Sequence, residues 1–380
     1  MLGEVKKQLC LAGPLVAGFL LQYAVQMISV MFVGHLGELT LAGAAVAASF
    51  AAATGFGLLL GMVSGLDTLC GQAFGAGEHR QLGIHKQRAM LVLSLVSVPV
   101  AALWACAGKV LARCGQDPEI AAAAGSYIRW LIPALFAFGP LQCHVRFLQA
   151  QNLVVPVMLS SGAAALGHPA VCWLLVRRLG FGFRGAALAN GVSYLANLFF
   201  LALYVRLSPS CKTTWQGFSR EALRGIAGFL KLAMPSALMM CIEGWSFELL
   251  LLLSGLLPHP KLETAGLSIC FSISAIAFMV SSGLGVAISN DKEVIKYTRR
   301  MLPLVAASIM LDCQQTALSG VVRGCGWQKR GAFINLAAFY LVGIPAAVTF
   351  AFVCHLGGMV FALHINPWVF LYFLIYFYLK

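Results

Sequence analysis

The sequence predicts an all-α polytopic membrane protein with about 11 transmembrane helices. Its 380 residues are 60% hydrophobic and only 10% charged, and the mean hydropathy is +0.86. A soluble core of this length could not bury so much apolar surface. Stretches long enough for a membrane span, about 17 to 25 residues, recur along the chain with few or no charges. The candidate spans are residues 10–33, 40–66, 89–108, 121–143, 152–176, 185–205, 232–257, 264–289, 301–321, 331–354 and 356–379.

Details of the first spans support their assignment as membrane helices. Residues 10–33 follow two lysines, as the apolar part of a signal peptide does, but that part is usually only about 7 to 15 residues long. We therefore expect a retained helix. In the second span, Gly57, Gly61 and Gly65 recur every four residues and would let a neighbouring helix approach closely. Arg129 is the one cation well inside these spans, and its side chain is expected to extend to the interface.

A polar stretch, residues 206–224, separates six spans from the five that follow. It is the best domain boundary in the chain. We expect an N-lobe at residues 1–209 with six transmembrane helices, a cytoplasmic inter-lobe linker at 210–225, and a C-lobe at 226–380 with five.

The two halves resemble each other, as the halves of many transporters do. Three pairs of segments match in order: residues 63–66 (VSGL) with 281–284 (SSGL), 116–120 (QDPEI) with 290–294 (NDKEV), and 167–170 (GHPA) with 343–346 (GIPA). The offset between partners is 218 in the first pair but 174 and 176 in the other two. The second half therefore lacks about 44 residues after Ser289, the counterpart of residues 72–115 with its loop and helix.

The formal net charge of +13 does not indicate nucleic-acid binding, because the basic residues lie singly or in pairs at the ends of spans. There they act as topology signals and contact lipid headgroups. In the first half, eleven basic residues fall on one side and five on the other, so the N-terminus is expected in the cytoplasm. An odd number of helices after the boundary would invert the chain beyond Ser289, where the basic residues divide four against three. Residues 370–380 also differ from every other span, which suggests a variant terminus.

Three acids lie inside spans. Residues 232–257 carry no charge except Glu243 and Glu248, and the span 301–321 contains Asp312. A carboxylate near the bilayer centre costs at least about 2.5 kcal/mol, so these groups are candidates for proton coupling. A spacing of five residues places Glu243 and Glu248 about 140° apart on a helix, so one can be the coupling acid and the other a polar contact on a different face.

The remaining polar and aromatic residues inside spans leave two interpretations open. Gln22, Gln26, Asn190 and Asn197 could hydrogen-bond a substrate without titrating, or they could join helices to each other. Trp245 could pack against an aromatic or cationic ligand, or it could serve helix packing. His144 and His168, near helix ends or proline, are expected in core or interface roles.

No cofactor or metal is implied. The twelve cysteines contain no C-x-x-C pair and no His or Cys cluster at zinc spacing, so we expect them to be small packing residues. The glycines near residue 75 lack the G-x-x-x-x-G-K pattern of a nucleotide-binding loop. No nucleophile and base pair appears, so an enzyme is not expected.

Four motifs carry a family resemblance. Residues 65–78 read GLDTLCGQAFGAGE, residues 33–37 read VGHLG, residues 241–248 read CIEGWSFE and residues 318–328 read LSGVVRGCGWQ. Together they resemble the multidrug and toxic compound extrusion (MATE) transporters, in the wording of the plant DETOXIFICATION proteins. The resemblance covers about residues 5–363. The first motif is expected to form a Gly-rich loop, with these residues: Asp67, Gly71, Gln72, Gly75 and Gly77. Asp67 is expected to be solvated or bonded to a helix rather than to take part in transport.

The resemblance implies two six-helix lobes around a central cavity, alternating between inward-open and outward-open forms. It also implies a monomer that exports small organic compounds in exchange for protons, across the plasma membrane or the vacuolar membrane. Glu243 and Glu248 would lie in the second-lobe cavity, and Asp312 would complete the proton site there. The chain departs from the family pattern at the missing segment after Ser289. The alternative function is therefore a transport-inactive shortened isoform, or an artefact of the gene model.

Overall fold

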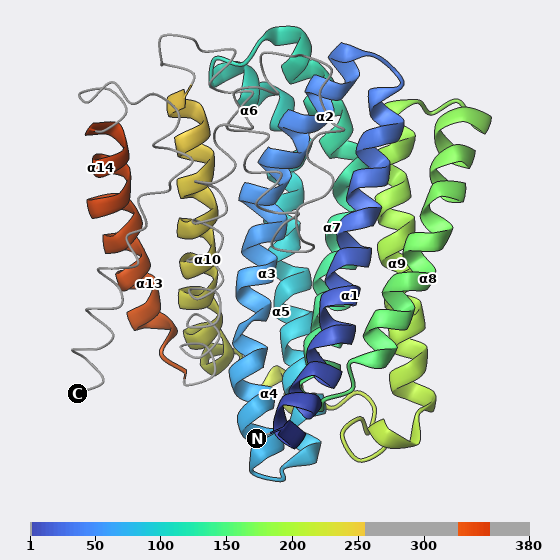
Figure 1. The fold of residues 1–380 in the computed structure, drawn as a ribbon, viewed down its shortest axis with the longest axis vertical. Coiled ribbons are helices and arrows are strands. Elements are labelled where there is room, and N and C mark those ends of the chain that lie inside the picture. Colours follow the sequence, from blue (N-terminus) through green and yellow to red (C-terminus); the bar gives the residue numbers. More distant parts are fainter. Residues whose placement is uncertain (1, 255–325, 350–380) are drawn as a thin grey trace. The chain divides into compact units, whose positions relative to one another are not determined.

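The computed structural model describes residues 2–254 and 326–349, and these parts consist of helices joined by turns and loops, without a β-strand (Figure 1). The α-helices are α1 (Leu2–Gly34), α2 (Glu38–Ala51), α3 (Gly57–Val63), α4 (Gly65–Gly75), α5 (His79–Ala105), α6 (Ala107–Arg113), α7 (Pro118–Ala150), α8 (Val155–Trp173), α9 (Phe183–Leu207), α10 (Ile226–Ser254), α13 (Gln328–Leu336) and α14 (Ile344–Val348). Shorter helical turns are Ala52–Phe56, Leu174–Arg178, Pro209–Cys211, Arg220–Leu223 and Ala337–Gly343.

Six stretches of the described residues are long and apolar enough to cross a membrane. They are Ala17–Gly34, Leu39–Gly75, His79–Ala105, Pro118–Ala150, Val154–Arg178 and Phe183–Leu207. Each corresponds to one of the first six spans expected from the sequence, so the prediction of an all-α polytopic membrane protein is confirmed. The expected missing segment after Ser289, the inverted orientation and the unusual terminus lie outside the described residues.

The Gly-rich segment differs from the expectation of a loop. Residues 65–75 continue the second span as α4, and only Gly77 has a left-handed backbone, with φ of 74°. The reason is the apolar face formed by Leu66, Cys70 and Ala73, which follow one another at helical spacing and are all buried. Burial of this face outweighs the cost of about 1 kcal/mol for each glycine inside a helix.

Small residues let the helices of the bundle approach closely, as the four-residue glycine spacing predicts. A Cβ at Gly61 would lie 2.6 Å from the Cα of Ala237 on α10, and one at Gly65 would lie 3.3 Å from Ala233. Gly57 differs, because a Cβ there would meet the carbonyl oxygen of Ala52 in its own helix. Two glycines of the ridge therefore provide the contact with α10.

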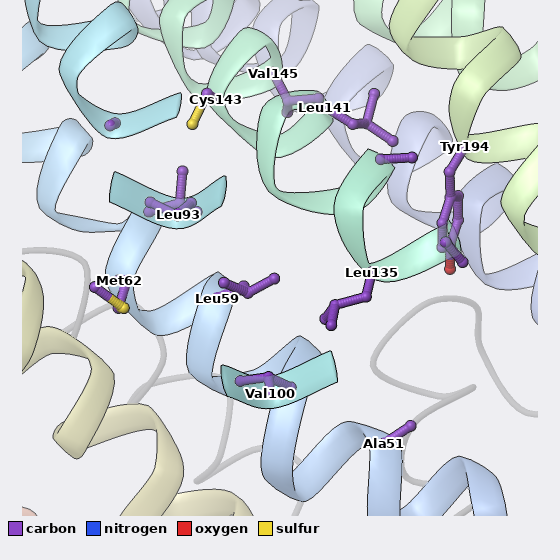
Figure 2. Packing of buried hydrophobic residues seen from close by; sticks show 14 of the residues in the cluster. Ala51, Leu59, Met62, Leu93, Val100, Leu135, Leu141, Cys143, Val145 and Tyr194 are labelled. Carbon is purple, nitrogen blue, oxygen red and sulfur yellow. The ribbon is translucent and has the colours of Figure 1, made fainter. Parts of the chain in front are cut away.

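The core of the first six spans is formed mainly by the facing sides of α3, α5, α7 and α9. Figure 2 shows Leu59, Leu93 and Leu135 converging from three of these helices. Trp104 at the end of α5 is completely buried, and its indole N–H donates a hydrogen bond of 3.0 Å to Thr54 Oγ1. This aromatic side chain fills the space beside Gly55, where a Cβ would collide with the indole.

The chain divides into two compact units, Met1–Ala237 and Leu238–Lys380. In the second unit, Ile242 near the middle of α10 and Phe339 in the turn after α13 are buried together. Asn335 of α13 donates a hydrogen bond of 3.4 Å to the carbonyl oxygen of Met239. The division falls inside α10 because its first turns, including Phe229 and Ala233, belong to the core of the first unit.

Candidate functional site

The amides expected to line a cavity instead connect three helices of the first unit. Gln22 on α1 and Asn197 on α9 both donate to Ser161 Oγ on α8, at 3.3 and 3.4 Å. Gln26, one turn after Gln22, donates to the hydroxyl of Tyr194 at 3.3 Å. Of the two interpretations left open by the sequence, these contacts favour helix joining for Gln22 and Asn197.

Asn190 belongs to a second buried group, centred on His168. The imidazole lies within hydrogen-bond distance of two hydroxyls, 2.9 Å from Ser29 Oγ and 2.7 Å from Ser193 Oγ. Ser29 Oγ in turn donates to Asn190 Oδ1 at 3.1 Å. His168 is completely buried, which agrees with the expected core role. The group ties α1, α8 and α9 together, and it satisfies polar atoms that would otherwise be costly inside a membrane.

Two of the five cavity candidates keep an accessible side chain. Gln26 is exposed and Trp245 is 45% exposed, whereas Asn190 and Asn197 are buried. Asn197 Oδ1 is also a buried acceptor with no hydrogen-bond partner among the described residues. Gln22 is half-buried, so Gln26 and Trp245 are the most accessible of the five candidates.

Two of the three intramembrane acids lie on one continuous helix. α10 runs unbroken from Ile226 to Ser254, so Glu243 and Glu248 keep their separation of about 140° around its axis. Trp245 lies between them on the same helix. Asp312 lies outside the described residues.

Asp67 forms an ion pair with a different helix, which fits the expected helix-bonded role. Its carboxylate lies 3.5 Å from the guanidinium of Arg146 on α7, and the two side chains are 28% and 20% exposed. Asp67 also lies in the first turn of α4, where the helix dipole favours a negative charge. Gln72 and the glycines at 71 and 75 follow it on α4, and Gly77 makes the turn into α5.

Sequence reasoning missed Lys86, which hydropathy alone places among the charges outside the third span. Its side chain is completely buried on α5, and Nζ has no hydrogen-bond partner among the described residues. Nζ instead lies 3.8 Å from the ring centroid of Trp215 and 4.6 Å from that of Phe147. Both distances are within the range of cation–π attraction. The signal that could have found this contact is Trp215, one of two aromatic residues in the predicted linker.

The linker is held along α5 by further contacts. Gln87 makes two hydrogen bonds to the linker backbone. Its Nε2 donates to the carbonyl of Gly217 at 2.6 Å, and its Oε1 accepts from the N–H of Ser219 at 2.8 Å. Thr214 donates to Gln151 Oε1 at 2.9 Å. A Cβ at Gly83 would collide with the carbonyl oxygen of Thr214, so the glycine permits the close approach. The linker is therefore a docked part of the first unit.

Metal binding finds no support in the described residues, since no three His, Cys, Asp or Glu side chains gather there as ligands.

Comparisons with known proteins agree on one family. The family model MatE matches residues 14–174 and 286–349. Protein DETOXIFICATION 16 of Arabidopsis thaliana is 49% identical, over 93% of this chain and 83% of the relative. Protein DETOXIFICATION 15 of the same plant is 48% identical over the same shares. The crystal structure of the eukaryotic MATE transporter AtDTX14 has a TM-score of 0.89 at 39% identity, covering 97% of this chain and 93% of that one. An outward-facing multidrug resistance MATE transporter has a TM-score of 0.80 at 16% identity, which shows the fold alone.

Proposed function

Because this chain belongs to the MATE family of membrane transporters, we propose that it is a proton-coupled antiporter that exports or sequesters small organic compounds by alternating access. Membership makes it an integral multi-pass transporter rather than an enzyme. The coupling ion, the substrate, the membrane and the cytoplasmic N-terminus are parts of the proposal. So is the division into an N-lobe, a linker and a C-lobe.

The observation that carries proton coupling is the pair of carboxyl groups inside the continuous helix α10. Glu243 and Glu248 are its only charged residues beyond Lys231. Among the acids described in the first unit, Asp67 lies in the first turn of α4 and is paired with Arg146, and Glu78 is exposed in the turn before α5. Since a carboxylic acid inside a membrane can take up a proton from one side and release it to the other, the C-lobe is the place for coupling.

The two acids have different roles in this proposal. Their positions are about 140° apart around the axis of α10, so the two acids belong to different faces of the helix. Glu243 is the coupling acid, together with Asp312, and Glu248 contributes on another face of α10. Gln26 and Trp245 are the first substrate candidates, because their side chains are exposed, although Gln26 also donates a hydrogen bond to Tyr194.

A transport experiment tests this proposal. Proteoliposomes containing the full chain are given a pH gradient, and uptake of a fluorescent organic cation is measured. We expect uptake that depends on the gradient and is abolished by Glu243→Gln. Glu78→Gln is the matched control, because Glu78 is exposed at the turn before α5. Uptake without gradient dependence, or full uptake by Glu243→Gln, would contradict the proposal.

The second candidate is a transport-inactive shortened member of the family. The specific observation is the unequal family match, which covers residues 14–174 in the first half but only 286–349 in the second. In addition, 93% of 380 residues is about 353, so roughly 50 of the 404 positions aligned with DETOXIFICATION 16 lack a residue in this chain. Sequencing of transcripts across the Ser289–Asn290 junction distinguishes the two. Reads that all insert about 44 residues there would show an artefact of the gene model.

A further inference from the structure

Two arginines from different helices meet in one pocket at the end of the first unit that lies opposite the linker. The pocket has a volume of about 430 Å³ and is lined by Ser126, Arg129 and Trp130 of α7 and by Arg184 of α9. Residues 126, 129 and 130 share one face of α7, because they are spaced by three and four. Arg184 is the second residue of α9, so the starts of both helices contribute to the pocket.

The lining carries positive charge that no described acid neutralises. The ion pairs among the described residues are Arg80 with Glu221 and Arg146 with Asp67, and neither involves the pocket. Among the described residues Arg129 uses only Nε, which donates a hydrogen bond of 3.1 Å to the carbonyl oxygen of Gly125, so its two terminal nitrogens have no partner there. Arg184 makes no side-chain hydrogen bond to a described residue, and its guanidinium lies over the ring of Phe183.

The start of α9 adds to this positive field. Gly182 precedes the helix, and no side chain caps the first backbone N–H groups. The N-terminus of a 25-residue helix carries roughly half a positive charge, which favours an anion beside it. With two guanidinium groups and the hydroxyl of Ser126, the pocket offers hydrogen-bond donors from three side chains and attracts negative charge.

The depth of the pocket matches the headgroup region of a bilayer. α7 has 33 residues and is about 50 Å long, which exceeds the hydrocarbon thickness of about 30 Å by roughly 10 Å at each end if the helix is centred. The hydrogen bond to Gly125 turns the Arg129 side chain back by one turn, to a level about 10 Å from the start of α7. That level is the boundary between the hydrocarbon and the headgroups.

Aromatic side chains beside the pocket indicate the same environment. Trp130 is 38% exposed, and its ring lies 6.2 Å from that of Phe181. Tryptophan at the membrane interface places an amphipathic ring at the level of the headgroups. An occupant with a charged head and an apolar body would contact the arginines and these rings together, whereas a free anion would use the arginines alone.

We propose that Arg129, Arg184 and Ser126 bind the phosphate group of an anionic phospholipid in the leaflet opposite the linker, with Trp130 beside its apolar part. The two guanidinium groups bind the phosphate oxygens by charge-assisted hydrogen bonds, for which their planar geometry is suited. The chemistry is that of a phosphate ester, and the interfacial depth favours the lipid over a soluble phosphate. None of the residues that line this pocket is among the transport residues proposed for α10.

The test uses the full chain in an uncharged detergent. Its thermal unfolding midpoint is measured while phosphatidylglycerol, phosphatidylcholine or inorganic phosphate is added. We expect phosphatidylglycerol alone to raise the midpoint, and we expect the double variant Arg129→Gln/Arg184→Gln to weaken its apparent affinity at least about tenfold. Arg178→Gln is the matched control. It removes a cation at the same end that lies over Trp173 and does not line the pocket, so its lipid affinity should be unchanged.

If the double variant does not fold, Arg184→Gln alone serves, since this exposed side chain supports no described contact except with Phe183. It should weaken the lipid affinity several-fold and leave the midpoint without lipid unchanged. Equal affinity in the variant and the wild type would overturn the site. A midpoint raised as much by inorganic phosphate as by the lipid would overturn the lipid assignment.

Discussion

The ammonium nitrogen of Lys86 lies 3.8 Å from the ring centroid of Trp215, although the two residues belong to a transmembrane helix and to the linker after the sixth span. The side chain of Lys86 is completely buried, and its charge faces two aromatic rings instead of a carboxylate. A desolvated cation–π contact contributes about 2 kcal/mol or more of attraction, which offsets part of the cost of burying the ammonium and joins the linker to α5.

The coupling between Lys86 and Trp215 can be measured with a double-mutant cycle. Trp215→Leu leaves the buried ammonium beside Phe147 alone, so we expect it to lower the unfolding midpoint strongly. Lys86→Met keeps the length of the side chain without its charge. In the Lys86→Met background, Trp215→Leu should cost about 1 to 2 kcal/mol less than in the wild type. Additive effects of the two substitutions would show that no attraction exists between the ring and the charge.

The docked linker predicts the reactivity of Cys211. This thiol is completely buried outside the membrane spans, and burial raises its pKa above the usual value, although Lys86 opposes the rise. Because the thiolate is the reactive form, we expect maleimide to leave Cys211 unlabelled at neutral pH. Gln87→Ala removes both of its hydrogen bonds to the linker and should speed the labelling. Exposed Cys106 and Cys114 label in both proteins and serve as internal controls. Fast labelling of Cys211 in the wild type would refute docking.

Two glycines of the second span should respond in opposite ways to the same substitution. Gly61→Ala places a Cβ 2.6 Å from the Cα of Ala237, and overpacking of this kind costs about 1 to 3 kcal/mol. At Gly71 no heavy atom lies within 4 Å, so Gly71→Ala should stabilise α4 by up to about 1 kcal/mol. Thermal unfolding in detergent measures both. Destabilisation by Gly71→Ala would indicate that this segment does not remain helical.

His168 is expected to hold helices together. His168→Leu leaves the hydroxyl of Ser193 without its imidazole partner and removes one contact of Ser29, which should cost about 1 to 3 kcal/mol. The matched control is His35→Leu, at an exposed position in the turn after α1. Unfolding midpoints of the two variants give the comparison. Equal midpoints would mean that the contacts of the imidazole contribute nothing.

Hydropathy predicted the first six helices well but misjudged where they begin and end. The third span was expected at residues 89–108, yet α5 begins at His79 and carries Arg80, Lys86 and Arg88 on its first turns. A hydropathy window detects the part inside the hydrocarbon, whereas these turns are stabilised by the linker. The segment at residues 65–75 was expected to be a loop because of its glycines. The structure shows instead that it is a helix with one buried face.

The sequence could predict which residue types form the candidate site, but it could not predict which residues they contact. Polar residues inside spans drew attention to Gln22, Asn190 and Asn197, since such groups are costly in a membrane unless they have a use. The partners of Gln22 and Asn190 depend on the packing of α1 against α8 and α9, more than 130 residues away in the sequence, and that of Asn197 depends on the packing of α9 against α8. Lys86 was missed because the cation–π contact that accounts for its burial depends on an aromatic residue in another segment.

The docked linker also changes what a protease would encounter. Lys212, Arg220 and Arg224 are trypsin sites in a polar segment that a sequence alone would mark as an easy target. Here the neighbours Cys211 and Thr214 are buried, so cleavage requires the segment to open first. When opening and closing are fast relative to cleavage, the cutting rate follows the population of the open form. The rate of trypsin cleavage would then measure the free energy needed to open the linker away from α5.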